Sequence, residues 1–491
     1  MLHTAHCFIV IVTLSVPSSS AYADLKRAEA AYEHGDYRRS SEELSQLARD
    51  GDAAAQFLLG ESFEKGRGVL QDFGEAIRWY AMAAEQSHPQ AQEVLCTAYF
   101  FGESGAQQDF AQAARFCSAA GDQSKAYPAY LAGYIHEFGK GGRQDLARAA
   151  DLYKIAAVAG NVDAQEALGR LYFFGQGVKQ DYAEAAKWNR VPAERGKAFS
   201  QFLLGYAYDW GQGLTKDPAQ AAIWYRKAAL QNEVRAMSAL GYLYSQGAGV
   251  KRDHAEAVKW FLKAAEHGDN SVAAALGWSY YQGRGTPGSI PEATKWFTQA
   301  AEDGDAQSQF MLGFMNDRPK TGARNPVEAA KWYRKSAEQS HPDAMAALAH
   351  LYFSGDGVTA DYAQAALWYT KLAEGGDTQA QYLLGYIYES GENGVSADLR
   401  KAARWYQPAA DKGNALAQFH LGRLFFEGKG VASDAVIGYM WSNLAALALS
   451  GEARIAAEKQ RDYIASQLTP EQQSKAQQMA RDWKPASAAQ Q

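Results

Sequence analysis

The sequence lacks long apolar runs and any excess of basic residues. No run reaches the about 20 apolar residues that a membrane-spanning helix needs. Lys and Arg total 49 against 55 Asp and Glu, which gives a net charge of −6. This balance argues against nucleic acid, because proteins that bind it carry basic stripes. We therefore expect neither a membrane span nor a nucleic-acid partner.

The short motifs of common catalytic and metal sites are also missing. The ten histidines are scattered, with no H-E-x-x-H and no other metal-ligand spacing. No P-loop occurs, and no nucleophile and base stand in a recognisable pattern. We expect a protein that is not an enzyme and that holds neither a metal nor a cofactor.

Proline is scarce and glycine is abundant, with 13 Pro against 45 Gly, beside 12 Trp and 28 Tyr. Many glycines with few prolines suggest a turn that recurs between helices. A chain of 491 residues is too long for one compact core, since single cores stop growing near about 250–300 residues. The composition therefore favours either several domains or one long repeat array.

The amino-terminal segment predicts export. Residues Phe8 to Val16 are apolar but too few to span a bilayer, and Ala21-Tyr22-Ala23 gives the small-x-small pattern that a signal peptidase accepts. We expect residues 1–23 to be a cleaved signal peptide. The mature protein, starting near Asp24, would then be periplasmic or secreted.

A period of 36 residues runs through the rest of the chain. Its landmark is a small residue, and successive landmarks are 36 residues apart except for two spacings of 37. The eleven landmarks are Gly60, Cys96, Gly133, Gly169, Gly205, Gly241, Gly277, Gly313, Ala349, Gly385 and Gly422. Eleven units therefore occupy residues 53–451.

Each unit predicts two helices joined by a turn. In the sixth unit, Met237 to Ser245 has apolar residues at helical spacing, which predicts helix A. Gly247 and Gly249 should end helix A, and Asp253 should cap the following helix B. The landmark Gly241 lies mid-helix at a cost of about 1 kcal/mol, so we expect the backbone of another helix to press against it.

Helix B carries a recurring tryptophan. Nine of the twelve tryptophans occupy one position of the unit: Trp79, Trp188, Trp224, Trp260, Trp296, Trp332, Trp368, Trp405 and Trp441. We expect these large rings to fill the gaps between neighbouring hairpins. One hairpin cannot bury its apolar faces alone, so the units must stack.

The pattern A-x-x-L-G-x-x-Y-x-x-G-x-G-V-x-x-D-x-x-x-A-x-x-W-Y-x-x-A-A resembles the Sel-1-like repeat, a relative of the tetratricopeptide repeat. The resemblance covers nearly all of the chain after the signal segment. It implies an all-α fold, a right-handed α/α superhelical solenoid of helix-turn-helix repeats. It further implies scaffold or adaptor work with no shared catalytic residue.

The ends of the array predict caps. Residues 24–52 resemble a tetratricopeptide hairpin, and residues 452–483 predict two helices, the second with a capping box at Thr469-Pro470-Glu471-Gln472. Residues 484–491 should form a disordered tail.

Only Cys96 and Cys117 follow the signal segment. By the tetratricopeptide analogy they lie on helices A and B of one hairpin, and an exported protein can keep a disulfide. A disulfide and two buried free thiols both stay open. A cysteine-rich branch of the family, with penicillin-binding activity attributed to it, has paired cysteines in most repeats. This sequence lacks that framework, so the activity is not carried over.

If helix A lines the concave side, as the resemblance implies, the residues one, four and five positions after the landmark should face a groove. Either packing against the next hairpin or ligand binding would explain the many rings there. The candidate groove residues are Tyr134, Phe138, Phe173, Phe174, Tyr206, Trp210, Tyr242, Trp278, Tyr281, Phe314 and Tyr386. Acids are interleaved at Glu61, Glu64, Glu137, Asp209, Asp317, Glu389 and Glu427, and they favour a ligand that carries Lys or Arg.

Two functions follow from these features. Rings with polar tips are typical of protein-binding hot spots, which favours an exported scaffold that binds a protein or peptide partner. Aromatic faces also stack on sugars, so the alternative is an envelope polysaccharide-binding protein or an accessory to exopolysaccharide export. The acids count against an anionic polymer.

Overall fold

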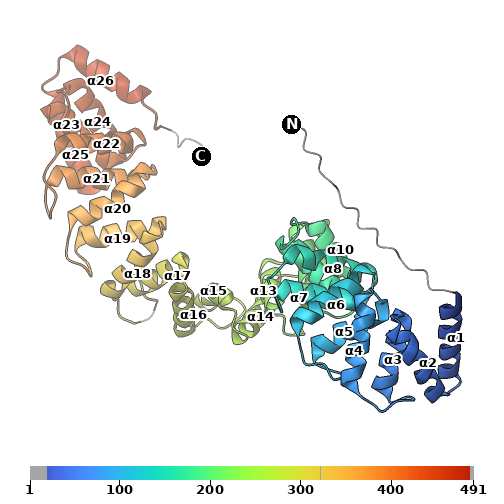
Figure 1. Ribbon diagram of the computed structural model, residues 1–491. Coiled ribbons are helices and arrows are strands. Elements are labelled where there is room, and N and C mark those ends of the chain that lie inside the picture. Colours follow the sequence, from blue (N-terminus) through green and yellow to red (C-terminus); the bar gives the residue numbers. More distant parts are fainter. Residues whose placement is uncertain (1–18, 321, 487–491) are drawn as a thin grey trace, which may run out of the picture. The chain divides into compact units, whose positions relative to one another are not determined.

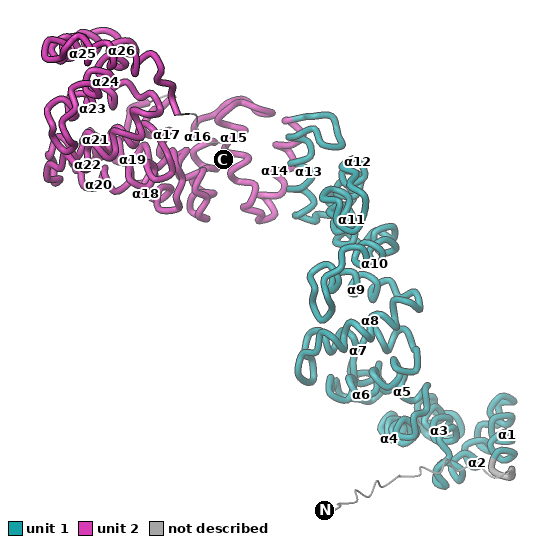
Figure 2. The backbone as a smooth tube through the Cα atoms, turned by 90° about the horizontal axis from the view of Figure 1, so that it is seen from above, with its two compact units in different colours: residues 1–253 teal, residues 254–491 magenta. Residues whose placement is uncertain are grey.

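The computed structural model describes residues 19–320 and 322–486, and the elements of this part of the chain are helices joined by turns and loops, with no strand (Figure 1). The all-α prediction is confirmed. The chain divides into two compact units, Met1–Asp253 and His254–Gln491 (Figure 2). Most of the predicted signal peptide lies outside the described residues, and α1 begins at Ser19.

The helices of unit 1 are mostly 13 residues long. They are α1 (Ser19–Glu33), α2 (Tyr37–Arg49), α3 (Ala53–Lys65), α4 (Phe73–Glu85), α5 (Pro89–Phe101), α6 (Phe110–Asp122), α7 (Ala126–Phe138), α8 (Leu146–Val158), α9 (Val162–Phe174), α10 (Tyr182–Glu194), α11 (Ala198–Trp210), α12 (Pro218–Ala229) and α13 (Val234–Gln246).

Unit 2 continues the same pattern. Its helices are α14 (His254–Glu266), α15 (Ala273–Gln282) after a 3-10 turn (Asn270–Val272), α16 (Ile290–Glu302), α17 (Ala306–Asp317), α18 (Pro326–Glu338), α19 (Pro342–Ser354), α20 (Tyr362–Glu374), α21 (Thr378–Ser390), α22 (Leu399–Asp411), α23 (Ala415–Glu427), α24 (Ala435–Ala448), α25 (Gly451–Ala465) and α26 (Pro470–Asp482).

Within each unit, successive helices pack against one another, except that α25 and α26 both pack on α24. From α3 onward the odd-numbered helices are the predicted helix A of each repeat and the even-numbered ones are helix B. The core is therefore not one central cluster. It is a series of small apolar clusters, each shared by two or three adjacent helix pairs.

Local chemistry sets the ends of these helices. The first turn glycine takes a left-handed conformation after helix A, as at Gly139 with φ 62° and Gly211 with φ 69°, where residues with a Cβ are strained. Ten of the helix B caps form as predicted. An Asp side chain accepts from a free backbone amide in eight units, and Ser289 and Asn325 do so in two more.

The landmark glycine faces an aromatic ring, so the expectation of a helix backbone there was wrong for most units. A Cβ on Gly133 would lie 2.6 Å from the ring of Tyr153 on the following helix B. Equivalent pairs at 2.5–2.8 Å are Gly60 and Tyr80, Gly205 and Tyr225, Gly277 and Phe297, Gly313 and Tyr333, and Gly385 and Tyr406. Two units differ: Gly169 faces the Asn189 side chain, and Gly422 approaches the Ser442 hydroxyl and the backbone of Gly438 and Ser442.

The expectation that the recurring tryptophans fill the gaps between hairpins was wrong for most units. Only Trp260, Trp368 and Trp441 are buried among the nine, while the residue that follows the tryptophan is almost fully buried in most units, as at Tyr225 and Tyr406. Several tryptophans instead carry a lysine amine over the ring, at 4.1 Å for Lys227 on Trp224 and 4.3 Å for Lys335 on Trp332.

Helical pairs stand at both ends of the array. Helices α1 and α2 pack together before the first repeat, and α25 and α26 both contact α24 after the last. The capping box at Thr469 and Gln472 forms as predicted. Of the predicted tail, residues 484–486 are described, and the Ala486 amide donates to the Asp411 carbonyl at 2.8 Å; residues 487–491 lie outside the described part.

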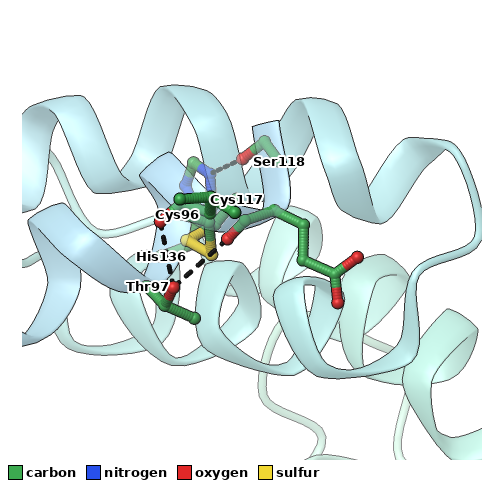
Figure 3. Close-up of a disulfide and its surroundings, with 7 residues drawn as sticks. Cys96, Thr97, Cys117, Ser118 and His136 are labelled. Carbon is green, nitrogen blue, oxygen red and sulfur yellow. Dashed lines mark hydrogen bonds between the residues drawn. A yellow bond between two sulfur atoms is a disulfide. The ribbon is translucent and has the colours of Figure 1, made fainter. Parts of the chain in front are cut away.

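Cys96 on α5 and Cys117 on α6 form a disulfide (Figure 3). Both residues are fully buried, and their Cα atoms are 4.6 Å apart. His136 on α7 lies beside them, with Nε2 at 3.3 Å from the Ser118 hydroxyl. Of the two alternatives that the sequence left open, the structure has the bonded one, and the bond joins the two helices of one repeat.

Candidate ligand-binding groove

The predicted groove residues differ widely in exposure. Phe138, Phe174, Trp210 and Tyr242, all in unit 1, are exposed, with exposed fractions from 39% for Tyr242 to 63% for Trp210. The other seven are half-buried. The exposed rings therefore gather on the helix A positions of unit 1, and this unit offers the most accessible aromatic surface.

Three successive A helices of unit 1 enclose a cavity of about 430 Å³. We call it the groove. It is lined by Tyr130, Tyr134, Glu137 and Phe138 of α7, Tyr153 of α8, Asp163, Glu166, Ala167 and Arg170 of α9, Lys197 at the start of α11, and Phe199 of α11. Of the sequence candidates, Tyr134 and Phe138 are among these lining residues.

A buried carboxylate stands at the floor of the groove. Glu137 is 4% exposed; it accepts a hydrogen bond of 2.8 Å from the Tyr153 hydroxyl and pairs with Arg170 of the next repeat. Burial and the neighbouring Glu137 carboxylate raise the pKa of Tyr153 far above its usual range. The floor is therefore a fixed ion pair that ties two repeats together.

The rim of the groove carries a second set of charges. The amine of Lys197 lies 2.6 Å from the Asp163 carboxylate and 3.9 Å from that of Glu166, which also accepts from the Ser200 hydroxyl at 3.1 Å. The hydrogen bond to Asp163 raises the pKa of Lys197. Both charged side chains of the Lys197–Asp163 pair are about half exposed. A charged group of a ligand can therefore reach either side chain and pair with it.

Aromatic rings continue the apolar surface around these charges. Tyr130 packs on Tyr153 with ring centroids 6.0 Å apart, and Tyr134 packs on Phe138 at 4.7 Å. Burial raises the pKa of Tyr130. Further along unit 1, the ring of Tyr206 contacts Phe173 at 5.2 Å. The rings form a discontinuous strip along the A helices.

The candidates of unit 2 are mostly engaged in packing. Trp278 meets Phe297 edge-on at 5.5 Å, and Tyr281 lies under the Lys320 amine at 3.8 Å. Phe314 packs on Phe310, and Tyr386 packs on Phe353. Packing explains these half-buried rings, so they give less support to binding than those of unit 1.

All seven interleaved acids have partners within the fold. Their partners are Lys65 for Glu61, Tyr80 for Glu64, Tyr153 and Arg170 for Glu137, Tyr225 for Asp209, Arg324 for Asp317, Tyr406 and Arg423 for Glu389, and Lys429 for Glu427. The acids therefore stabilise hairpins and repeat junctions, and they give little reason by themselves to expect a basic ligand.

The groove also contains residues that sequence reasoning missed. Tyr130 and Glu166 lie three residues before their landmark glycine, one helical turn from the position predicted to face the groove. Lys197 and Phe199 lie at the start of α11. Extending the predicted face by one turn would have included Tyr130 and Glu166.

Neither a metal cluster nor a membrane-spanning helix accompanies this surface in the part of the chain that the structure describes. Within residues 19–320 and 322–486, no group of three or more His, Cys, Asp and Glu side chains is arranged to hold a metal ion. No helix among the same residues has the length and apolar character required to cross a membrane.

Comparison with known proteins identifies the family. Eleven segments match the family model described as Sel1 repeat, over residues 53–88, 89–125, 129–161, 162–188, 198–233, 234–269, 271–305, 306–341, 342–377, 378–414 and 415–448. The chain belongs to the Sel1 repeat family, and the predicted resemblance is confirmed. Proteins of this family generally act as protein-interaction scaffolds, and their solenoid fold is typically non-catalytic.

Among solved structures, the chain is similar to c5321, a protective antigen present in uropathogenic Escherichia coli strains and displaying an SLR fold. The two are 30% identical, with 92% of this chain and 99% of that chain covered and a TM-score of 0.59. A Sel1 repeat protein from Oxalobacter formigenes is 24% identical over 63% of this chain and 90% of its own, with a TM-score of 0.47.

A curated mouse protein, DAP3-binding cell death enhancer 1 from Mus musculus, is 36% identical over 66 residues. That match spans 13% of each protein.

Proposed function

We propose that this protein is an exported, non-catalytic scaffold that binds a peptide or protein partner in the groove of unit 1. The observation that carries the proposal is the cavity of about 430 Å³ between α7, α9 and α11, where the exposed ring of Phe138 and the half-buried rings of Tyr130, Tyr134 and Phe199 lie beside two ion pairs. Hot spots of protein interfaces combine aromatic anchors with charged groups in this way. The similarity to scaffold-type repeat proteins supports the same function.

Export is the second part of the proposal. It rests on the apolar segment Phe8 to Val16 and on Ala21-Tyr22-Ala23. Amino-terminal sequencing of the protein isolated from its own cells should find a mature chain that begins near Asp24. A protein that still begins at Met1 would contradict export.

Site-specific photo-crosslinking tests the use of the groove. A photoreactive residue replaces Phe138, which lines the groove and is 55% exposed, and in a matched control it replaces Ile223 of α12, which is 47% exposed. We expect one protein to crosslink at position 138 and not at 223. Equal capture at both positions would contradict binding in the groove.

A double substitution measures how much the groove rings contribute to binding affinity. Tyr134→Ala with Phe138→Ala should weaken binding of the captured partner at least about tenfold, because aromatic anchors dominate interface energies. Ile223→Ala should leave binding unchanged, and circular dichroism should show the same helix content in all variants. If envelope glycan and no protein is captured at position 138, the ligand of the groove is a polysaccharide. The aromatic rings would then stack on its sugar units.

A further inference from the structure

A second and larger cavity, of about 630 Å³, lies in unit 2. We call it the unit 2 cavity. It is lined by Ala363, Ala366, Leu367, Thr370 and Lys371 of α20, Tyr388 of α21, Gly394, Val395, Ser396, Ala397 and Asp398 of the α21–α22 loop, and Lys401 of α22. It therefore belongs to the B helices and the turn of the tenth repeat, and it shares no residue with the groove.

The cavity lies beside a turn that stands away from the preceding helix B, as the turn of the eighth repeat also does at Gly322. In nine repeats the second turn glycine is pressed against the first turn of that helix, so that a Cβ would overlap it; these are Gly68, Gly105, Gly141, Gly177, Gly213, Gly249, Gly285, Gly357 and Gly430. At Gly394 a Cβ would come no nearer than 3.9 Å to Ala363. The turn of the tenth repeat is one residue longer than usual, and the Tyr362 amide donates to the Asn393 carbonyl at 2.9 Å.

Leu367, which lines the cavity, differs from the residue type that is most common at its position in the repeat. The position before the tryptophan is basic in seven units, at Arg78, Arg115, Lys187, Lys259, Lys295, Lys331 and Arg404. Five of these side chains pair with a glutamate three residues earlier on the same helix. Leu367 replaces the cation with an apolar side chain that is 51% exposed, as Ile223 does in the fifth repeat at 47% exposed.

Lys401 also differs from the residue type that is common at its position, since it adds a cation where Leu367 removes one. The third position of helix B is Glu or Gln in eight units: Glu75, Gln112, Glu184, Gln220, Glu256, Glu292, Glu328 and Gln364. Lys401 puts a cation there, as Arg148 does in the third repeat, and its amine lies 5.1 Å from the centre of the Tyr388 ring. Both substitutions line this cavity, so the two changes act on the same surface.

The charges of the cavity are unequal. Lys371 and Lys401 contribute two ammonium groups, against the single carboxylate of Asp398. One oxygen of Asp398 already accepts the backbone amides of Arg400 and Lys401 at the start of α22. Its other oxygen is 3.7 Å from the Lys401 amine. The cavity therefore favours an anionic group beside its apolar lining of Leu367, Val395 and the alanines.

We infer that the unit 2 cavity binds an extended peptide segment in which an apolar side chain stands next to a carboxylate. The apolar side chain enters against Leu367 and Val395, and the carboxylate is held between Lys371 and Lys401. Charge complementarity and the apolar lining together favour this ligand over a basic peptide or a neutral one.

Fluorescence polarisation with full-length protein tests the inference. The probe is a fluorescein-labelled peptide, Gly-Ser-Leu-Glu-Leu-Asp-Gly-Ser. Two comparison peptides replace its acidic residues with Lys or its leucines with Ser. We expect the first probe to bind, and both comparison peptides to bind at least about tenfold more weakly.

The test variants restore the residues that other repeats use, so they are expected to fold. Leu367→Lys and Lys401→Glu should each weaken binding of the acidic probe at least about fivefold. Lys295→Glu on α16 makes the same charge change as Lys401→Glu at a surface outside the cavity and should leave binding unchanged. Helix content by circular dichroism checks each fold.

Three results would overturn the inference: no binding of the acidic probe, equal binding of the serine peptide, or equal loss of affinity in Lys295→Glu. An oligogalacturonate that competes, while the leucines make no difference, would show that the cavity takes an anionic sugar polymer instead of a peptide. Each of these outcomes leaves the proposed groove of unit 1 untouched, since that site has its own variants.

Discussion

Gly205 shows how one residue aligns the two helices of a repeat. Its missing side chain lets the Tyr225 ring approach to within 2.6 Å of where a Cβ would lie. The ring is 1% exposed, and its hydroxyl donates to Asp209 one turn further along the same helix A. Burial and the Asp209 carboxylate raise the pKa of Tyr225 above its usual range. The glycine, the ring and the acid thus position one helix on the other.

Gly205→Ala should destabilise the protein. Overpacking a core costs about 1–3 kcal/mol, while alanine gains about 1 kcal/mol of helix propensity over glycine, so we expect a net loss of about 1 kcal/mol. The midpoint of urea unfolding, followed by circular dichroism, measures it. Gly142→Ala is the control, because nothing lies within 4 Å of its Cβ position. An unchanged midpoint for Gly205→Ala would show that the Tyr225 ring can shift to accommodate the added methyl group without loss of stability.

At the scale of the helix, caps decide where each element begins. Five A helices have an Asp or Asn as N-cap. The N-caps of α5 and α19 are instead His88 and His341, whose Nδ1 atoms accept from the Ala91 and Ala344 amides at 3.4 Å. The two imidazoles stack on Phe57 and Phe310, each at 4.9 Å. The matching Ser-His-Pro segments are therefore capping turns. Such a cap requires a neutral imidazole, because a protonated ring nitrogen cannot accept.

The His88 cap predicts a pH dependence. Burial lowers the pKa of His88, so between its folded value and the unfolded value near about 6.5 the unfolded chain binds more protons. The stabilisation is complete above the unfolded pKa and is lost as the pH falls towards the folded one. We expect acid to weaken the folded state through this cap, by about 1 kcal/mol or less.

His88→Asn provides the test, because Asn161 and Asn414 cap α9 and α23 at the same position. The thermal midpoint of this variant should fall less than that of the wild type between about pH 7.5 and about pH 5. All other titrating groups are common to the two proteins. Equal falls in both would rule out the cap as a source of acid sensitivity.

For the molecule as a whole, stability comes from neighbours, since each repeat contacts only the next. The last repeat buries Trp441, at 4% exposed, and Tyr439, at 5%, in clusters that include Ala480 of α26 and Ile464 of α25. Trp483 completes this packing with its ring 6.1 Å from that of Trp441. Helices α25 and α26 therefore cover an apolar face that would otherwise meet water.

Ending the chain before Gly451 should expose that face. We expect a lower thermal midpoint and aggregation that rises with protein concentration, measured by differential scanning fluorimetry and light scattering, because exposed apolar patches associate. A chain that ends at Ala486 is the control and should behave as the full protein. A shortened protein that stays monomeric at high concentration would show that α25 and α26 are dispensable as a cap.

The helices and their ends could be predicted from the sequence because their causes are local. The 36-residue period, the left-handed glycines after helix A, the Asp caps of helix B and the Thr469 capping box all follow from satisfying backbone groups within a few residues. The same period predicted the face of helix A that carries Tyr134 and Phe138, both of which line the cavity between α7, α9 and α11, because register within a helix fixes the face on which a residue lies.

The contacts between these helices could not be predicted in the same way, because they depend on how the repeats stack. Trp224 and Tyr225 are adjacent in sequence, but their side chains lie about 100° apart around the helix, and packing beside Gly205 selected the tyrosine as the buried ring. Glu137 pairs with Arg170 of the next repeat, and the turn of the tenth repeat stands away from the preceding helix B at Gly394. These contacts depend on the distances between neighbouring repeats, and the sequence of one repeat does not determine those distances.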